Sequence, residues 1–202
     1  MSTARTSARQ LGVALRAVAV LTLALGLVYP LVVTGLGQAV AGNRANGSPV
    51  TVDGTTVGSE LIGQSFTDEN GAALPQWFQS RPSAAGDGYD GGASGGSNLG
   101  PTNPDLAAAI RERRTAVAEL EGVDPDDVPA DALTASSSGL DPHISPEYAL
   151  LQADRVAAER GLDTGEVRAL VEAAVEGRQA GVLGQGRVNV LKLNIALSEL
   201  DT

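Results

Sequence analysis

The chain has 202 residues, with 24 acidic and 14 basic side chains and a formal net charge of −10 at pH 7. It contains no cysteine, which excludes disulfides, thiolate metal ligands and a cysteine nucleophile. An acidic chain of this kind also lacks the Lys and Arg clusters with which proteins bind the phosphates of nucleic acids.

An uncharged apolar segment near the N-terminus is the most informative feature of the sequence. It spans residues 17–40, and a helix needs about 20 apolar residues to cross a hydrocarbon core of roughly 30 Å. Arg5, Arg9 and Arg16 precede the segment, whereas the acidic residues begin only at Asp53. Cytoplasmic flanks are enriched in Arg and Lys. The sequence therefore predicts one membrane helix, with the N-terminus inside and the remaining chain outside.

A cleaved signal peptide is the alternative interpretation of the same segment. Ala39-Val40-Ala41 fits the small-residue cleavage pattern, and Pro30 could end a shorter apolar core. Signal-peptide cores usually run for only about 7–15 residues, so the length favours an uncleaved anchor. Gly35 and Gly37 would allow a partner helix to approach closely.

The chain after this segment is predicted to form a single acidic domain. The expected boundaries are a short basic cytoplasmic N-terminus at 1–16, the membrane helix at 17–40, a linker at 41–49 and an extracytoplasmic soluble domain at 50–202. Four of the 14 basic residues precede residue 45 and all 24 acidic residues follow it, so the later part carries a charge of −14. Such a charge raises the local concentration of cations and favours solubility.

The first part of the domain is predicted to be β structure followed by loop. Val50–Val52 and Thr55–Val57 flank Asp53-Gly54, a pair typical of the type I′ turn in two-residue hairpins. Leu61–Phe66 is expected to extend the second strand. Seven glycines fall within residues 86–100, which predicts a segment without regular structure.

Two helices with clear start and stop signals are predicted next. Asn103 is a good N-cap for a helix that begins at Pro104, and Gly122 is expected to end it. Ser145 provides the same kind of start for a second helix, which should end at Gly161.

The C-terminal part adds a third helix and one ambiguous segment. Asp163 and Glu166 have the spacing of a capping box, and the helix should end before Gly177. Residues 188–197 fit either a strand or a buried helix. The predicted fold class is α+β, with a single N-terminal transmembrane helix followed by one mixed α/β domain.

Most constellations that mark an enzyme or a metal protein are missing. Lys192 is the only lysine, and no Gly-Lys phosphate-binding loop occurs. The glycine-rich Ser94–Ser97 segment lacks the strand that precedes such a loop. One histidine is too few for a typical zinc site, and residues 124–131 lack the spacing of an EF-hand.

An external hydrolase is the alternative function, built on Asp141, His143 and a serine of Ser136–Ser138. A serine nucleophile requires a base and an orienting acid that converge on it. No Gly-x-Ser-x-Gly elbow is present. A histidine that bonds backbone groups in a turn beside the Ser145 cap is the simpler interpretation.

Several segments resemble the signature stretches of the KdpC family, the members of which are accessory components of the bacterial Kdp potassium-transporting ATPase. These segments are Gly58–Phe66, Phe78–Ser83, Ser94–Pro104, Leu133–Pro146 and Gly184–Asn194. Their order and spacing agree with the family over essentially the whole chain, as does the single N-terminal span. Ser137 and Gly186 stand where the family often has glycine and proline, respectively.

The resemblance implies an accessory subunit of an ATP-driven potassium importer in the bacterial inner membrane. The implied partners are a channel-like potassium-binding subunit, an ATP-hydrolysing P-type subunit and a small lipid-embedded peptide. Hydrolysis then belongs to the P-type partner, so no catalytic residue and no metal ligand are expected in this chain. The family is described as a catalytic chaperone, which raises the ATP affinity of the hydrolysing partner and stabilises the assembly.

The predicted topology separates the domain from cytoplasmic ATP, so we expect the effect on ATP affinity to be allosteric, with the membrane helix as the connection. If ATP is instead contacted directly, in a ternary complex with the ATP-hydrolysing partner, the expected donors are amide and hydroxyl groups. They are Asn98, Ser136, Ser137, Ser138 and Gln152. Ordinary loop and cap hydrogen bonds are the competing role for these side chains.

Overall fold

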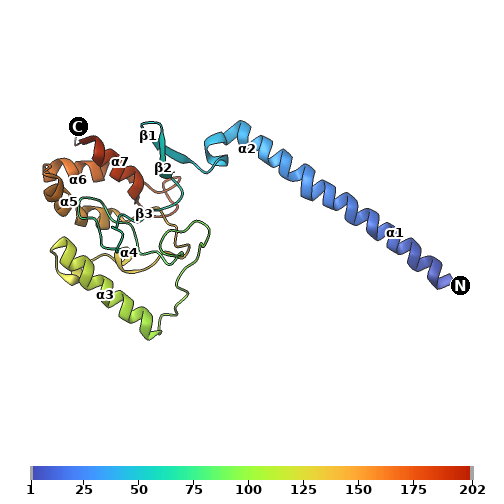
Figure 1. Ribbon diagram of the computed structural model, residues 1–202, viewed down its shortest axis with the longest axis horizontal. Helices are drawn as coiled ribbons and strands as arrows, with labels where there is room; N and C mark the ends of the chain where they lie inside the picture. The colour runs from blue at the N-terminus through green and yellow to red at the C-terminus, as the bar shows by residue number, and fades with distance from the viewer. Residues whose placement is uncertain (1, 201–202) are drawn as a thin grey trace. The chain divides into compact units, whose positions relative to one another are not determined.

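A computed structural model describes residues 2–200 of the chain, with side chains from residue 7 onward. The chain divides into two units, Met1–Pro49 and Val50–Thr202, and each is described by itself. Figure 1 labels helices α1 to α7 and strands β1 to β3. The side chain of Arg5, in the predicted basic flank, and residues 1, 201 and 202 lie outside the described part.

The N-terminal unit is a long helix with one irregular turn. It consists of α1 (Ser2–Leu23), the π-helical turn η1 (Ala24–Val28) and α2 (Tyr29–Ala45). Pro30 explains the turn, because proline lacks an N–H group and its ring clashes with the carbonyl four residues earlier. The amide of Tyr29 accordingly donates to the carbonyl of Ala24, five residues back. Among the described residues, Ser7–Ala45 is long and apolar enough to cross a membrane.

Residues 41–45, predicted to start a linker, continue α2 instead. Ala41 has φ −146° and ψ 50°, so the helix is kinked there rather than ended. The side chain of Asn46 stabilises the last turn, because its Nδ2 donates to the carbonyl of Gly42 over 2.8 Å and its Oδ1 accepts from Gln38 over 2.9 Å. The linker is therefore shorter than its composition predicts.

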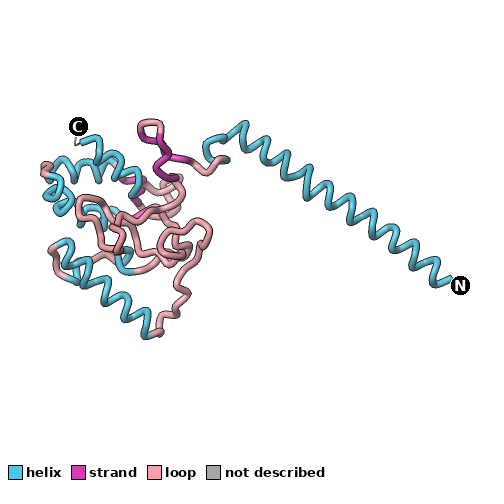
Figure 2. Tube along the Cα trace, viewed as in Figure 1, coloured by secondary structure: helices cyan, strands magenta, loops and turns pink. Residues whose placement is uncertain are grey.

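The second unit is a mixed α and β domain, which confirms the predicted fold class. Its elements from residue 49 onward are β1 (Pro49–Val52), β2 (Thr55–Ser59), α3 (Pro104–Glu121), the 3₁₀ turn η2 (Pro125–Asp127), α4 (Ala130–Leu133), β3 (His143–Ile144), α5 (Pro146–Arg160), α6 (Thr164–Ala173), β4 (Val175–Glu176), β5 (Arg187–Asn189) and α7 (Val190–Leu200). Figure 2 shows how much of the chain between β2 and α3 is loop.

The hairpin and the first two helices form as predicted. Asp53 and Gly54 have φ of 49° and 79°, the left-handed pair that a type I′ turn requires. Asn103 accepts from the amide of Asp105 over 2.7 Å and starts α3, and Ser145 accepts from the amide of Tyr148 over 3.0 Å and starts α5. Local start and stop signals therefore decided these elements.

Two predictions in this part of the chain were incomplete or wrong. Leu61–Phe66 does not extend β2, because the amide of Gly63 bonds instead to the distant carbonyl of Leu140 over 3.0 Å. The ambiguous 188–197 segment is a strand followed by a helix, since β5 ends at Asn189 and the Oδ1 of that residue accepts from the amide of Lys192 over 3.1 Å. Asn189 thus acts as the N-cap of α7.

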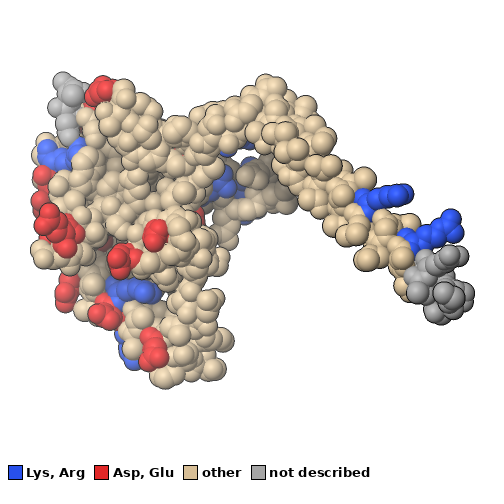
Figure 3. All heavy atoms as spheres, turned by 45° about the vertical axis from the view of Figure 1, so that its right-hand side comes forward, with Lys and Arg blue, Asp and Glu red and all other residues tan. Residues whose placement is uncertain are grey.

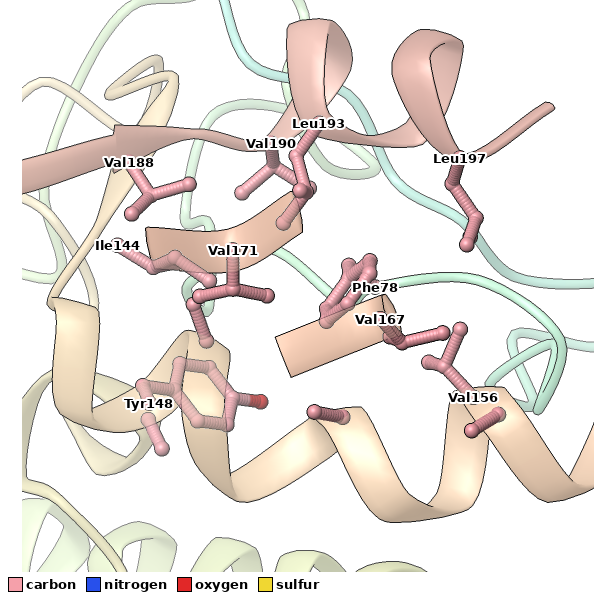
Figure 4. Packing of buried hydrophobic residues seen from close by; sticks show 14 of the residues in the cluster. Phe78, Ile144, Tyr148, Val156, Val167, Val171, Val188, Val190, Leu193 and Leu197 are labelled. Carbon is pink, nitrogen blue, oxygen red and sulfur yellow. The ribbon is translucent and has the colours of Figure 1, made fainter. Parts of the chain in front are cut away.

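The core lies between the small sheet β3-β5-β4 and helices α5, α6 and α7. In this antiparallel sheet Ile144 pairs with Val188, and both are buried. Figure 4 shows these two side chains beside Val171 of α6 and Leu193 of α7. Side chains alternate between the faces of a sheet. The other face must therefore carry His143, opposite Asn189, and Glu176, opposite Arg187.

Candidate functional site

Gln152, one of the expected ATP contacts, is buried inside the domain, and both polar atoms of its amide form hydrogen bonds there. Its Oε1 accepts from the backbone N–H of Gln79 over 2.6 Å, and its Nε2 donates to the carbonyl of the same residue over 3.1 Å. Arg155 donates to the same Oε1 over 3.0 Å. The side chain is 0 % exposed, so a ligand at the surface of the domain does not reach it.

Asn194 of α7 bonds in the same way to the backbone of Phe78, the residue before Gln79. Its Oδ1 accepts from the amide of Phe78 over 2.9 Å and its Nδ2 donates to the carbonyl over 3.0 Å. Together Gln152 and Asn194 satisfy the backbone of Phe78 and Gln79, a loop that runs through the core without a strand partner. We call this pair of side chains the amide clamp.

Hydrogen bonds to the backbone bring the serine loop (Ser136–Ser138) to the glycine-rich segment (residues 86–100). The amide of Gly95 donates to the carbonyl of Ser138 over 2.9 Å, and the hydroxyl of Ser94 donates to the same oxygen over 3.0 Å. Ser137, Ser138 and Asn98 are exposed, whereas Ser136 is buried and its hydroxyl has no hydrogen-bond partner among the described residues. The structure thus brings the serine loop to the segment that contains Asn98, and places Gln152 elsewhere.

A chain of five charged or titratable side chains lies on the outer side of the small sheet. It runs through Arg81, Asp141, His143, Glu176 and Arg187, which we call the ion-pair chain. Arg81 Nη1 lies 2.9 Å from Asp141 Oδ2, and Asp141 Oδ1 lies 3.3 Å from His143 Nδ1. His143 Nε2 is 4.0 Å from Glu176 Oε2, and Arg187 donates to that same oxygen over 3.0 Å.

Asp141 is the best-connected member of the ion-pair chain. Burial opposes its ionisation, but hydrogen bonds from the ring and the backbone N–H of His143, together with Arg81, outweigh that effect. The pKa of Asp141 is therefore held below its usual value. Arg81 also donates to the carbonyl of Thr134 over 3.3 Å. This bond joins the 78–83 loop to the chain just before the serine loop.

Sequence reasoning missed Arg81, Glu176 and Arg187 as partners of Asp141 and His143. All three lie far from Asp141 and His143 along the chain, and only the register of the sheet and the path of the 78–83 loop bring them together. A partial signal was present, because Arg81 and Asp141 both fall within segments singled out by their family resemblance.

The geometry supplies only part of the hydrolase constellation. The contact between Asp141 and His143 Nδ1 matches the orienting half of a catalytic triad. No hydrogen bond in the described part of the chain joins His143 to Ser136, Ser137 or Ser138, and the Ser138 hydroxyl accepts instead from the amide of Leu140 over 3.1 Å. Within the same residues, no group of three or more His, Asp or Glu side chains could hold a metal ion.

These features define the protein as one apolar N-terminal helix followed by an α+β domain whose buried polar groups mainly hold loops in place. The family model described as "K+-transporting ATPase, c chain" (KdpC) matches residues 11–199. The chain therefore belongs to the KdpC family.

Individual relatives agree over nearly the full length. The chain is 57 % identical over 189 residues to a "Potassium-transporting ATPase KdpC subunit" of Kineococcus radiotolerans, covering 94 % of this chain and 93 % of the relative. A protein of the same name from Nitratidesulfovibrio vulgaris is 54 % identical over 176 residues, with 85 % of each chain covered. One from Mycobacterium tuberculosis is 49 % identical over 193 residues, with coverage of 95 % and 99 %.

Proposed function

We propose that the chain is the accessory, non-catalytic subunit of an ATP-driven potassium importer. The observation that carries the proposal is the family match, which covers both the apolar helix and the soluble domain. The missing Gly-Lys phosphate-binding loop agrees with this role, because ATP hydrolysis then falls to another subunit. The proposed partners are a channel-like potassium-binding subunit, a P-type ATPase subunit and a small lipid-embedded peptide.

The N-terminal helix is the proposed anchor in the bacterial inner membrane. Arg9 and Arg16 precede the uncharged segment, and every acidic residue follows it. Figure 3 shows this uneven distribution of charge. Basic side chains lie near the start of the helix, and acidic side chains are spread over the domain. By the positive-inside rule the N-terminus is cytoplasmic and the domain is outside.

The proposed influence on the ATPase subunit is that of a catalytic chaperone acting allosterically. Two observations support an indirect effect over direct ATP contact. The amide of Gln152 is consumed by the amide clamp, and the side chain of Ser136 is buried. Asn98, Ser137 and Ser138 remain as the exposed candidates for direct contact.

Removal of residues 50–202 tests the assembly role. We expect the yield of purified complex and its potassium-stimulated ATPase rate to fall together, because the domain supplies contacts that hold the subunits. A complex that forms with normal yield and activity without the domain would contradict the proposal. Measuring both quantities separates loss of assembly from loss of regulation.

A thiol-labelling experiment tests the orientation. Ser137 is exposed and the chain has no cysteine, so Ser137→Cys introduces a single reactive group in this subunit. We expect a membrane-impermeant maleimide to label the subunit in intact cells, with Ser136→Cys as the buried control. Protection of Ser137→Cys until lysis would place the domain inside and favour direct contact with ATP.

A further inference from the structure

A cavity in the domain is lined neither by the sheet residues of the ion-pair chain nor by the expected ATP contacts. It has a volume of about 640 Å³, within the range of small-molecule pockets. None of Asn98, Ser136, Ser137, Ser138 and Gln152 lines it. Apolar groups from two regions form its wall: Phe66 and Ala73 from the loops, and Ala116, Val117 and Leu120 from α3.

Tyr148 contributes a polar group to the lining of the cavity. Tyr148 lines the cavity and is only 3 % exposed, and Figure 4 shows it at the N-terminal end of α5. No hydrogen bond to its hydroxyl is found within the described residues, and the hydroxyl oxygen is not among their fully enclosed unpartnered atoms. Burial raises the pKa of Tyr148, with a further contribution from the charge of Glu121, so the hydroxyl remains a hydrogen-bond donor at neutral pH.

Arginines outnumber acidic residues in the lining of the cavity. The charged residues that line it are Arg81, Arg113 and Asp87, in a domain that is acidic as a whole. Arg81 is paired with Asp141, whereas Arg113 has no ion pair among the described residues. Arg113 uses Nη1 to donate to the carbonyl of Leu133 over 3.0 Å, which leaves its other N–H groups for a ligand.

We propose that this cavity binds a monocarboxylate with an apolar aryl or alkyl group. The carboxylate would accept hydrogen bonds from Arg113 and Tyr148, and the apolar group would lie against Phe66, Val117 and Leu120. Charge-assisted hydrogen bonds to a guanidinium are the strong kind, and the apolar wall adds the burial that holds a small ligand. This site is independent of the proposed role in potassium import, because it is complete within one chain.

The test uses 4-phenylbutyrate and the full chain in lipid nanodiscs, with empty nanodiscs as the blank. Trp77 is the only tryptophan in the sequence, and its ring centroid lies 6.2 Å from that of Phe66, which lines the cavity, so binding is followed by its fluorescence and assigned to the cavity by the substitutions below. We expect saturable binding of 4-phenylbutyrate and much weaker binding of the uncharged analogue 4-phenylbutanol.

Substitutions identify the residues responsible. We expect Arg113→Gln to weaken binding about ten- to a hundredfold and Tyr148→Phe to weaken it several-fold, because each removes a donor to the carboxylate. Arg113→Lys, which keeps the charge, should recover part of the affinity. Arg111→Gln is the matched control, since Arg111 is an exposed arginine of the same helix that does not line the cavity.

Two outcomes would overturn the proposal. One is equal binding of 4-phenylbutyrate and 4-phenylbutanol, which would show that the carboxylate contributes nothing and that the probes bind only to lipid or to apolar surface. The other is unchanged affinity in both Arg113→Gln and Tyr148→Phe, with far-ultraviolet circular dichroism showing that the variants are folded. Both readouts use the isolated chain, so neither depends on whether the chain assembles with an ATPase.

Discussion

Buried polar side chains in this domain hold backbone that no strand or helix satisfies. Gln152 and Asn194 each make two hydrogen bonds to one loop residue. Each therefore satisfies both the backbone N–H group and the backbone carbonyl of that residue. Arg155 extends the arrangement, because it donates to the carbonyls of Pro75 and Trp77 and lies 2.9 Å from Glu121. Glutamine and asparagine thus replace a missing strand in the core.

Gln152→Ala should destabilise the fold rather than remove a ligand contact. The change leaves the buried N–H and carbonyl of Gln79 without partners and opens a small cavity, which costs about 2–4 kcal/mol. Urea unfolding of the full chain in detergent measures this. Gln185→Ala is the matched control, because Gln185 is exposed. A stable Gln152→Ala chain with specifically weakened ATP affinity of the complex would instead support direct contact.

Asp141→Asn should reduce stability at neutral pH and flatten its decline in acid. The folded-state pKa of Asp141 lies below its value in the unfolded chain, so its stabilising contribution is complete above about pH 4 and is lost as the pH falls through the folded pKa. We expect a loss of about 1 kcal/mol at pH 7, because the pair with Arg81 is partly exposed.

Urea midpoints measured between about pH 2.5 and pH 7 test this prediction across the range in which the carboxyl titrates. Asp126→Asn is the control, since Asp126 forms a surface pair with Arg114 and is 93 % exposed. If Asp141→Asn and the parent chain lose stability in parallel as the pH falls, Asp141 does not supply the acid dependence.

At the scale of elements, the sequence predicted best what is decided locally. The caps Asn103, Ser145 and Asp163 act on amides two or three residues away, and Asp53-Gly54 closes its own turn. These signals depend on a few neighbouring residues, so they are visible in the sequence without the fold.

Elements and contacts decided by distant residues were not predictable in the same way. Leu61–Phe66 has the composition of a strand, but Gly63 bonds to Leu140 and the segment becomes loop. In the sequence, Gln152 is a polar side chain that could bind a ligand. Only the fold shows that its amide is hydrogen-bonded to the backbone of Gln79. The ion-pair chain was half visible, because Asp141 and His143 are two residues apart, whereas their arginine and glutamate partners come from other loops and strands.

Gly139→Ala should separate the serine loop from the glycine-rich segment. Gly139 has φ 67°, and an added Cβ would lie 2.6 Å from the carbonyl oxygen of Gly95 and 2.7 Å from the Cβ of Ala85. The strained backbone and the overlap together cost about 2–4 kcal/mol. Limited proteolysis with chymotrypsin should cut more rapidly after Tyr89, and the urea midpoint should fall.

Gly100→Ala is the matched control for this change. A Cβ at Gly100 meets no atom within 4 Å, and the residue does not have a positive φ. We expect it to be neutral or slightly stabilising, because alanine restricts the unfolded chain. Equal behaviour of the two variants would mean that the contact between the two loops contributes little to the fold.

At the scale of the molecule, the uneven charge distribution is the property that bears on transport. Residues 45–202 hold all 24 acidic residues and ten of the 14 basic ones, which leaves a charge of −14. If this domain lies outside, near the entrance of the potassium pathway, it concentrates cations there. A potential of about one kT raises the local concentration of a monovalent cation roughly threefold.

The apparent potassium affinity of the assembled complex should therefore weaken as ionic strength rises. Exposed charges are screened beyond about 8 Å at roughly 0.15 M salt and about 3 Å at roughly 1 M. Potassium-stimulated ATPase activity measured in increasing N-methylglucamine chloride tests this, with sucrose as the control for osmolality. We expect the KM for potassium to rise about threefold, while the maximal rate changes less because the catalytic subunit is not the source of the effect.

A variant with fewer exposed acidic groups shows whether this domain causes the salt dependence. Glu112, Glu119 and Glu159 are exposed on helices α3 and α5 and form no ion pair among the described residues, so replacing all three by Gln removes charge without breaking a contact. The triple variant should start with a higher KM for potassium and respond less to added salt. A KM that is the same in both complexes at every ionic strength would show that the acidic surface serves solubility alone, because an electrostatic effect must depend on both charge and screening.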